Sequence, residues 1–394
     1  MLRRALIAAL SLLTVNSLSA QTEETMMVGG ESLTYSYTPI DQTSVKGSSR
    51  MFGRRLLEGL NQGLGGSADG SLSLLIGPGY SVDTGWRLGL RGSKSYRVGD
   101  SRRESSIAFS ASVSLTGSYH VALQGMNPLG DRHTLRYGVA VGSLPTRLYG
   151  LDYATSRQNI ASKYTEKRYE ARVGYSYAVT THLSLGAQLD YAYIGSVKLD
   201  ERTTELLDKE QLVYSGGSLT IGLNYDNRRY EEYRTRGIRL NVSGLLRPSV
   251  VSNYNHTLYT LRLQLDYYQP LWRGATLALD LYGEHNASAT PWMLRARLGD
   301  DNRMRGYYYG RYMGCNLLTA QLELRQHIWN GLGVAAWGGG GVAFDRVERG
   351  LLRQLLPTYG VGLRWGLGAR NMVRFDVAFG NDSHTFILGV SEAF

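Results

Sequence analysis

Residues 218–226 read SLTIGLNYD, and residues 258–267 read LYTLRLQLDY. In the first stretch every odd position from Leu219 to Tyr225 is apolar, and in the second every odd position from Tyr259 to Tyr267. The same alternation returns in VRFDVAF at 373–379. Successive side chains of a β-strand point to opposite faces, so this period of two predicts strands with one apolar and one polar face.

Alternation alone fits a soluble β-sandwich as well as a membrane barrel, and three further features favour the barrel. The alternating segments run for about 10–14 residues, longer than the roughly 5–6 residues typical of soluble strands. Tyr and Trp stand near many of their ends, as in the aromatic girdles of membrane barrels. Short connections such as 179–182 and 368–371 alternate with long ones such as 196–210 and 288–314. Tight turns at one end and long loops at the other are typical of outer-membrane barrels.

We therefore expect an all-β fold, a transmembrane antiparallel β-barrel of about 16 strands that occupies residues 71–394. The first expected strand lies near 71–81 and the last near 384–394. A bilayer requires closure, because an open sheet edge would leave backbone groups unpaired in hydrocarbon.

The residues before the barrel fall into two segments. Residues 1–20 have the form of a signal peptide, with Arg3 and Arg4 followed by an apolar core from Ala5 to Val15 that is too short to span a bilayer. Residues 21–70 are polar and irregular, and we interpret them as a short periplasmic or plug segment. Apolar spacing within 51–64 fits a short amphipathic helix, with an irregular loop as the alternative.

Composition sets limits on function. The mean hydropathy of −0.24 excludes a bundle of apolar membrane helices, and the single cysteine, Cys315, excludes an intramolecular disulfide. The net charge of the chain is +10. In a barrel, the positive charge fits a basic lumen or loops that face anionic lipid. We expect Cys315 to have a packing role.

Residues 301–314 read DNRMRGYYYGRYMG, a loop dense in Arg, Tyr and Gly. Such a loop can bind nucleic acid, decorate a surface, or fold back against a polar wall. The export signal and the barrel pattern argue against nucleic acid. We favour an inward-folded loop that braces the lumen.

Four motifs resemble those of one known family. Met304-Arg305-Gly306-Tyr307 is similar to an inward-folded loop motif, and VAFD at 342–345 resembles the strand that carries an inward Asp. YDNRRYEEYRTRGIRL at 225–240 resembles a turn motif, here Asp226, Arg228 and Gly237, although the usual Pro is absent. HTFILGVSEAF at 384–394 resembles a C-terminal assembly signal. Together these motifs resemble the BamA/TamA/two-partner-secretion superfamily, also called the bacterial surface antigen barrels.

The strand patterns agree with an inward loop. Glu323 lies in the inward set of 315–328 and Asp345 in that of 332–345, while the run Gly338 to Gly341 leaves room for a second backbone. A guanidinium suits carboxylates. We therefore expect Arg305, followed by Gly306 and Tyr307, to reach Glu323, Asp345 or both.

The barrel closes where its first strand meets its last, and we call this junction the seam. Gly77, Pro78 and Gly79 interrupt the first strand, and Gly389 thins the last. We expect this seam to be weak, and we expect Phe394 to end the last strand facing lipid.

The resemblance implies a role in inserting or translocating outer-membrane or surface proteins, in the outer membrane of a Gram-negative bacterium. The chain would be a short form without POTRA repeats, because residues 21–70 are too few for one, so other complex subunits would capture clients. Expected partners are client proteins, such subunits, outer-membrane lipid and lipopolysaccharide, but not nucleic acid. One alternative is a channel or structural barrel without insertase activity.

A second alternative is an outer-membrane phospholipase. His182 and Ser184 have the spacing of its catalytic pair, but their parity places them in the lumen, whereas a lipase nucleophile should face lipid. No P-loop, Gly-x-Ser-x-Gly or metal-binding pattern occurs in the sequence. We expect no enzyme activity, no cofactor and no metal.

Overall fold

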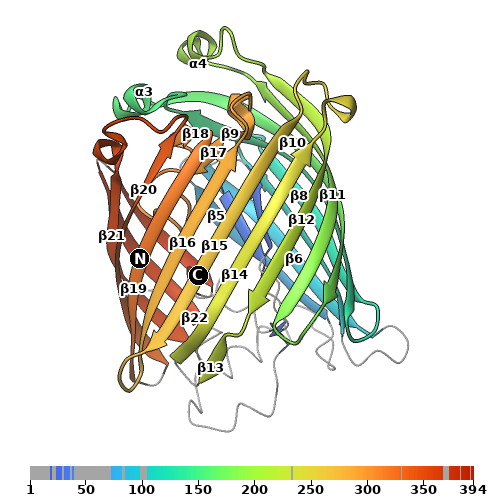
Figure 1. The fold of residues 1–394 in the computed structure, drawn as a ribbon, viewed down its shortest axis with the longest axis vertical. Helices are drawn as coiled ribbons and strands as arrows, with labels where there is room; N and C mark the ends of the chain where they lie inside the picture. Colours follow the sequence, from blue (N-terminus) through green and yellow to red (C-terminus); the bar gives the residue numbers. More distant parts are fainter. Residues whose placement is uncertain are drawn as a thin grey trace.

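The structure is a computed structural model that describes residues 72–81, 85–97, 104–231, 234–329, 331–366, 372–381, 383–390 and 392–394, together with four short strands within 18–39. Across these residues, sixteen long strands follow one another around a closed barrel (Figure 1). Each described ladder between long strands is antiparallel, and β23 stands beside β5 in the strand order. The expectation of an antiparallel barrel of about 16 strands is confirmed.

The long strands have the following bounds: β5 (Leu72–Ser81), β6 (Gly85–Tyr96), β7 (Ser105–Ser114), β8 (Tyr119–Pro128), β9 (His133–Leu148), β10 (Ser162–Ala178), β11 (Leu183–Val197), β12 (Val213–Asp226), β14 (Arg234–Arg247), β15 (Leu258–Pro270), β16 (Ala275–Asn286), β19 (Asn316–Trp329), β20 (Leu332–Phe344), β21 (Leu356–Gly366), β22 (Met372–Gly380) and β23 (Ser383–Val390). The short β13 (Arg229–Glu231) pairs with β14.

One end of the barrel carries the long connections. There lie α3 (Tyr153–Arg157), α4 (Glu201–Leu206), and the single 3-10 turns η1 (Ser249–Val251), η2 (Trp292–Leu294) and η3 (Leu351–Gln354) (Figure 1). Two short strands, β17 (Ala296–Leu298) and β18 (Tyr312–Gly314), pair within the connection between β16 and β19. We call this the α4 end and the opposite one the short-turn end. Because neighbouring strands run in opposite directions, the brief connections β7–β8 and β22–β23 also lie at the α4 end.

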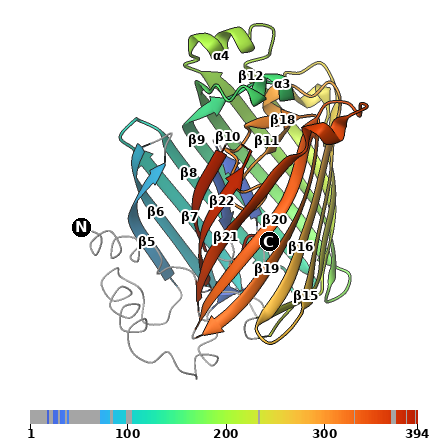
Figure 2. The same cartoon turned by 90° about the vertical axis from the view of Figure 1, so that its left-hand side faces the viewer.

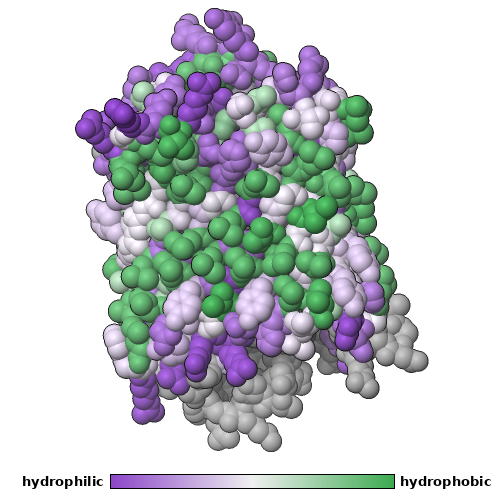
Figure 3. Space-filling view, in the orientation of Figure 1, coloured by the Kyte–Doolittle hydropathy of each residue, from purple (hydrophilic) through white to green (hydrophobic). Residues whose placement is uncertain are grey.

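The barrel wall is apolar outside and polar inside, as the alternation predicts. On β15, Leu261 is 53% exposed on the outer face, whereas Asp266 is fully buried on the inner face. Figure 3 shows apolar side chains gathered in a band across the wall, below a hydrophilic rim. Such a band suits the hydrocarbon of a bilayer. None of the described helices is long and apolar enough to cross a membrane.

The residues before β5 are described only in part. The segment expected to be irregular contains a hairpin of β2 (Glu24–Val28) and β3 (Glu31–Tyr35), and β1 (Leu18–Ser19) pairs with β4 (Thr38–Pro39). Part of the segment that we expected to be irregular therefore forms short paired strands. Most of the signal peptide at 1–20 and the helix expected at 51–64 lie outside the described residues.

Candidate functional site

The loop between β17 and β18, residues 299–311, enters the barrel lumen, and we call it the lumen loop. Its tip, Met304 to Tyr307, is almost completely buried. Met304 adopts a left-handed backbone with φ of +50°, and its backbone N–H donates to the Gln321 side chain at 3.2 Å. The tip therefore turns sharply at the residue whose backbone is hydrogen-bonded to the wall.

Gly306 permits the closest approach of this tip to the barrel wall. Its φ is +104°, and a Cβ atom there would lie 2.6 Å from the carbonyl carbon of Phe379 on β22. Any other residue would therefore suffer both backbone strain and a clash with main-chain atoms.

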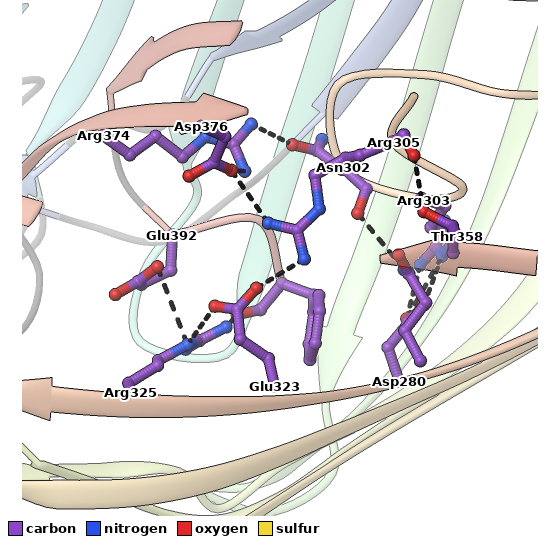
Figure 4. A network of polar contacts seen from close by, with 12 residues as sticks. Asp280, Asn302, Arg303, Arg305, Glu323, Arg325, Thr358, Arg374, Asp376 and Glu392 are labelled. Carbon is purple, nitrogen blue, oxygen red and sulfur yellow. Dashed lines mark hydrogen bonds and ion pairs between the residues drawn. The ribbon is translucent and has the colours of Figure 1, made fainter. Parts of the chain in front are cut away.

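Arg305 is fully buried, between two carboxylates from different strands (Figure 4). Its Nη1 donates to Asp376 on β22 at 2.9 Å, and its Nη2 donates to Glu323 on β19. Its guanidinium also lies over the Trp337 ring of β20, with Cζ 3.6 Å from the ring centroid. Buried charge-assisted pairs and a cation–π contact are strong because little water competes for them.

The expected pairing of Arg305 with Asp345 is wrong. Asp345 follows the end of β20, where its side chain is 46% exposed and pairs with Arg295 at 3.3 Å. The lumen loop extends deeper than expected: Arg305 lies level with Trp337, eight residues before Asp345, which is about 26 Å along a strand. At that depth the available carboxylate is Asp376, which shares the inward parity of Arg374 in VRFDVAF. That parity, and the position of Trp337 between inward-facing Ala335 and Gly339, were the signals that could have identified both residues.

Neighbouring contacts fasten the rest of the tip. Arg303 pairs with buried Asp280 of β16 at 3.0 Å and lies over Tyr282. The Tyr307 hydroxyl donates to the Pro357 carbonyl and accepts from the Asn381 backbone, both at 2.7 Å. Thr358 donates to the Arg305 carbonyl oxygen. The tip is thus bound to strands on both sides of Arg305.

A second layer joins this site to residues 392–394. Arg325 pairs with Glu323 at 2.7 Å, and Arg364 pairs with Glu392 at 2.8 Å and with Asp376. We call the lumen network the four arginines and three acids that meet here: Arg305, Arg325, Arg364, Arg374, Glu323, Asp376 and Glu392. Its formal charge is 4 − 3 = +1.

The expectation that Phe394 faces lipid is wrong. β23 ends at Val390, and Glu392 reaches the lumen network. Phe394 is 4% exposed, packs in a cluster with Tyr268 and Ala278, and accepts a hydrogen bond at its backbone oxygen from Arg325 at 3.0 Å. The parity argument failed because it extended the strand beyond its end, whereas these residues turn inward to pair with lumen arginines.

The turn motif lies at the short-turn end. Arg228 donates twice to Asp226, from Nε at 3.0 Å and from Nη2 at 2.9 Å. Gly237 has φ of +124°, and a Cβ there would lie 2.9 Å from the Arg228 Cα. The structure therefore brings Asp226, Arg228 and Gly237 together, with glycine needed for the close approach.

The seam residues lie in regular ladders. β5 pairs with β6 without interruption through Gly77, Pro78 and Gly79, so these residues do not break the strand, and Gly389 pairs with Arg374. The strands at this side are short: β22 and β23 have 9 and 8 residues, against 17 in β10.

Two further candidates carry no catalytic arrangement. His182 lies in the turn before β11, where its ring meets the Thr181 hydroxyl at 2.9 Å. Cys315 is buried, and this burial raises the pKa of its thiol, with the Asp345 carboxylate acting in the same direction. A raised pKa leaves little thiolate, the reactive form of cysteine.

Comparison with models of protein families shows which family this chain belongs to. The model of the Omp85 superfamily domain matches residues 84–394. This chain belongs to the Omp85 superfamily. It is therefore a bacterial outer-membrane barrel of that superfamily.

Solved structures agree on the Omp85 fold. BamA from Haemophilus ducreyi lacking POTRA domains 1-3 matches with a TM-score of 0.59 and 16% identity, over 81% of this chain and 69% of that one. CdiB from Escherichia coli matches with a TM-score of 0.56 and 14% identity, over 82% and 61%. CdiB from Acinetobacter baumannii gives 0.52 and 13%, over 79% and 56%. This chain therefore spans less than two thirds of either CdiB chain. No curated protein matches.

Proposed function

We propose that this Omp85 barrel takes part in inserting or translocating other outer-membrane or surface proteins, as one subunit of a larger complex in a Gram-negative outer membrane. In this proposal the α4 end faces the outside of the cell. Its partners are client chains, the other subunits and the surrounding lipid, including lipopolysaccharide.

One observation carries the proposal: the lumen is occupied. The tip of the lumen loop and residues 392–394 meet inside the barrel, held by the lumen network. A passive diffusion pore needs a lumen open to solutes, whereas these segments project into it and lie against the wall formed by β16 and β19 to β22. The resemblance of the loop motif to barrels that move polypeptides supports the same choice.

The short strands beside the seam add a second support. β22 and β23 share only 8 residue pairs, against 16 between β9 and β10. Fewer ladder hydrogen bonds make this side of the barrel the easier one to open.

We also propose that the barrel is not an enzyme and needs no cofactor. The phospholipase reading required a His182–Ser184 pair that faces lipid, and His182 instead lies in a polar turn. Among the described residues, no group of three or more His, Cys, Asp or Glu could hold a metal ion.

Depletion of the protein in its own cells tests the role. Levels of several outer-membrane proteins should fall and should recover with the wild-type chain. A cysteine pair across β5 and β23, in a Cys315→Ser background, should restore them only under reducing conditions, while each single-cysteine chain should restore them under both. Partners that copurify after mild detergent extraction would identify the complex.

The opposite result would support the channel reading. Unchanged outer-membrane protein levels after depletion, together with steady solute-selective conductance in planar bilayers, would contradict the proposal.

A further inference from the structure

We call the connection between β20 and β21, residues 345–355, the rim loop. Figures 1 and 2 both show its 3-10 turn η3 projecting beyond the barrel wall at the α4 end. The rim loop is thus placed beside the barrel, over whatever surrounds the wall.

The rim loop exposes large apolar side chains. Val347 and Leu352 are each 82% exposed, and Leu355 is about half exposed. Leu355 lies against the outer face of β20, where its Cδ1 is 3.3 Å from the position of a Gly340 Cβ. Below it, the outward residues of β21 continue the apolar wall. The rim loop therefore begins where the lipid-facing surface ends.

The same loop carries unpaired positive charge. Arg346, Arg349 and Arg353 are exposed, and no ion pair or side-chain hydrogen bond joins them to another described residue. Glu348 is the one acid among the exposed charges of the segment 346–353, which gives a formal charge of 3 − 1 = +2. Asp345 does not offset this charge, because it pairs with Arg295.

Cationic and apolar side chains at the edge of an apolar wall match one class of ligand. A membrane lipid with a phosphate-bearing headgroup offers anionic oxygens at the height of the arginines and acyl chains at the height of Leu355. Arginine forks suit phosphate, and their stems can lie along apolar surface while the charge stays at the interface. A free anion would leave Val347 and Leu352 without a role.

We propose that the rim loop is a binding site for a phosphorylated, multiply acylated lipid. Arg346, Arg349 and Arg353 hold its phosphates, while Leu352 and Leu355 contact its acyl chains. Only the choice of leaflet rests on the proposed function: with the α4 end outside, the lipid is the phosphorylated glycolipid of the outer leaflet. The site anchors one side of the barrel rim to the surrounding membrane.

Native mass spectrometry of the full-length barrel, titrated in detergent with purified lipid A, tests the site. The variant R346Q/R349Q/R353Q should bind lipid A about tenfold more weakly or worse, since it loses three charge-assisted phosphate contacts. The control R157Q/K163Q/K209Q removes the same charge from exposed positions at the same end. It should bind within about twofold of wild type, because surface charges away from the lipid are screened.

Two additional arms separate the headgroup from the acyl chains. Leu352→Ser should also weaken lipid A binding, and excess inorganic phosphate should displace little of it. Equal affinity in the arginine variant and its control would overturn the site, and so would complete displacement by phosphate alone. The assay contains no client protein, so its failure is distinct from failure of the depletion test.

Discussion

At the residue scale, the lumen network predicts which carboxylate matters. Asp376→Asn should lower the heat resistance of the folded band on gels, because it leaves Arg305 and Arg364 buried with one acid fewer. Loss of one partner from a buried ion pair costs about 3–5 kcal/mol. Asp345→Asn is the matched control and should change little, since the Asp345 side chain is 46% exposed and its ion pair with Arg295 is partly solvated. Equal losses of heat resistance in the two variants would contradict the assignment of Asp376, rather than Asp345, as a partner of Arg305.

The charge balance of the lumen network also predicts that loss of an acid destabilises the barrel more than loss of an arginine. Arg305→Ala leaves three arginines and three acids, a balanced set, whereas Glu323→Gln leaves four arginines and two acids. We expect Glu323→Gln to destabilise the barrel more, and Arg305→Ala mainly to release the lumen loop to added protease. A barrel destabilised more by Arg305→Ala than by Glu323→Gln would contradict this ordering.

Gly306 allows a separate test of close approach. Gly306→Ala should detach the lumen loop, because its Cβ would meet the Phe379 main chain at 2.6 Å. Gly130→Ala is the control: Gly130 also has positive φ, +85°, but a Cβ there meets nothing within 4 Å. Both variants carry backbone strain of about 1 kcal/mol, so only the first should expose the loop to protease. Similar protease patterns would show that strain alone explains the glycine.

At the element scale, two phenylalanines near the end of the chain have opposite environments: Phe386 on β23 is exposed on the outer face, whereas Phe394 is buried. Phe394→Ala should destabilise the detergent-solubilised barrel by about 3–5 kcal/mol, as for other buried phenylalanines. Phe386→Ala should have little effect in detergent, because Phe386 is 80% exposed on the outer face. Thermal unfolding followed by circular dichroism measures both. A larger loss for Phe386→Ala would mean that Phe394 is not packed inside the folded barrel.

The strands could be predicted from the sequence, but several contacts of residues beyond the strand ends could not. Alternation located the long strands because a bilayer enforces an apolar outer face at every second residue, and Glu323 followed from the same parity. Parity works only while a strand continues, which is why Asp345 and Phe394, both beyond strand ends, were assigned wrongly. Asp376 was missed because it lies 71 residues after Arg305 in the sequence. The alternation shows that Asp376 faces inward, but it does not show how far the loop reaches across β19 to β22.

At the scale of the whole molecule, one side of the barrel differs from the rest. Beside the seam the strands are short and the connections at the α4 end are brief, whereas β9 to β12 are long and carry α3 and α4. Inside, the lumen network links the loop tip with residues 392–394. We therefore expect a change at the seam to reach the loop through Glu392, Arg364 and Asp376, which direct ion pairs join.

The conductance of the purified barrel in planar bilayers tests the occupied lumen most directly. The wild-type chain should show no steady open level, and a chain in which residues 300–310 are replaced by a short Gly-Ser linker should show one. Arg305→Ala should lie between them, with frequent transitions, because it loosens the loop without removing it. A steady open level in the wild type, equal to that of the linker chain, would contradict an occupied lumen and with it the case against a passive pore.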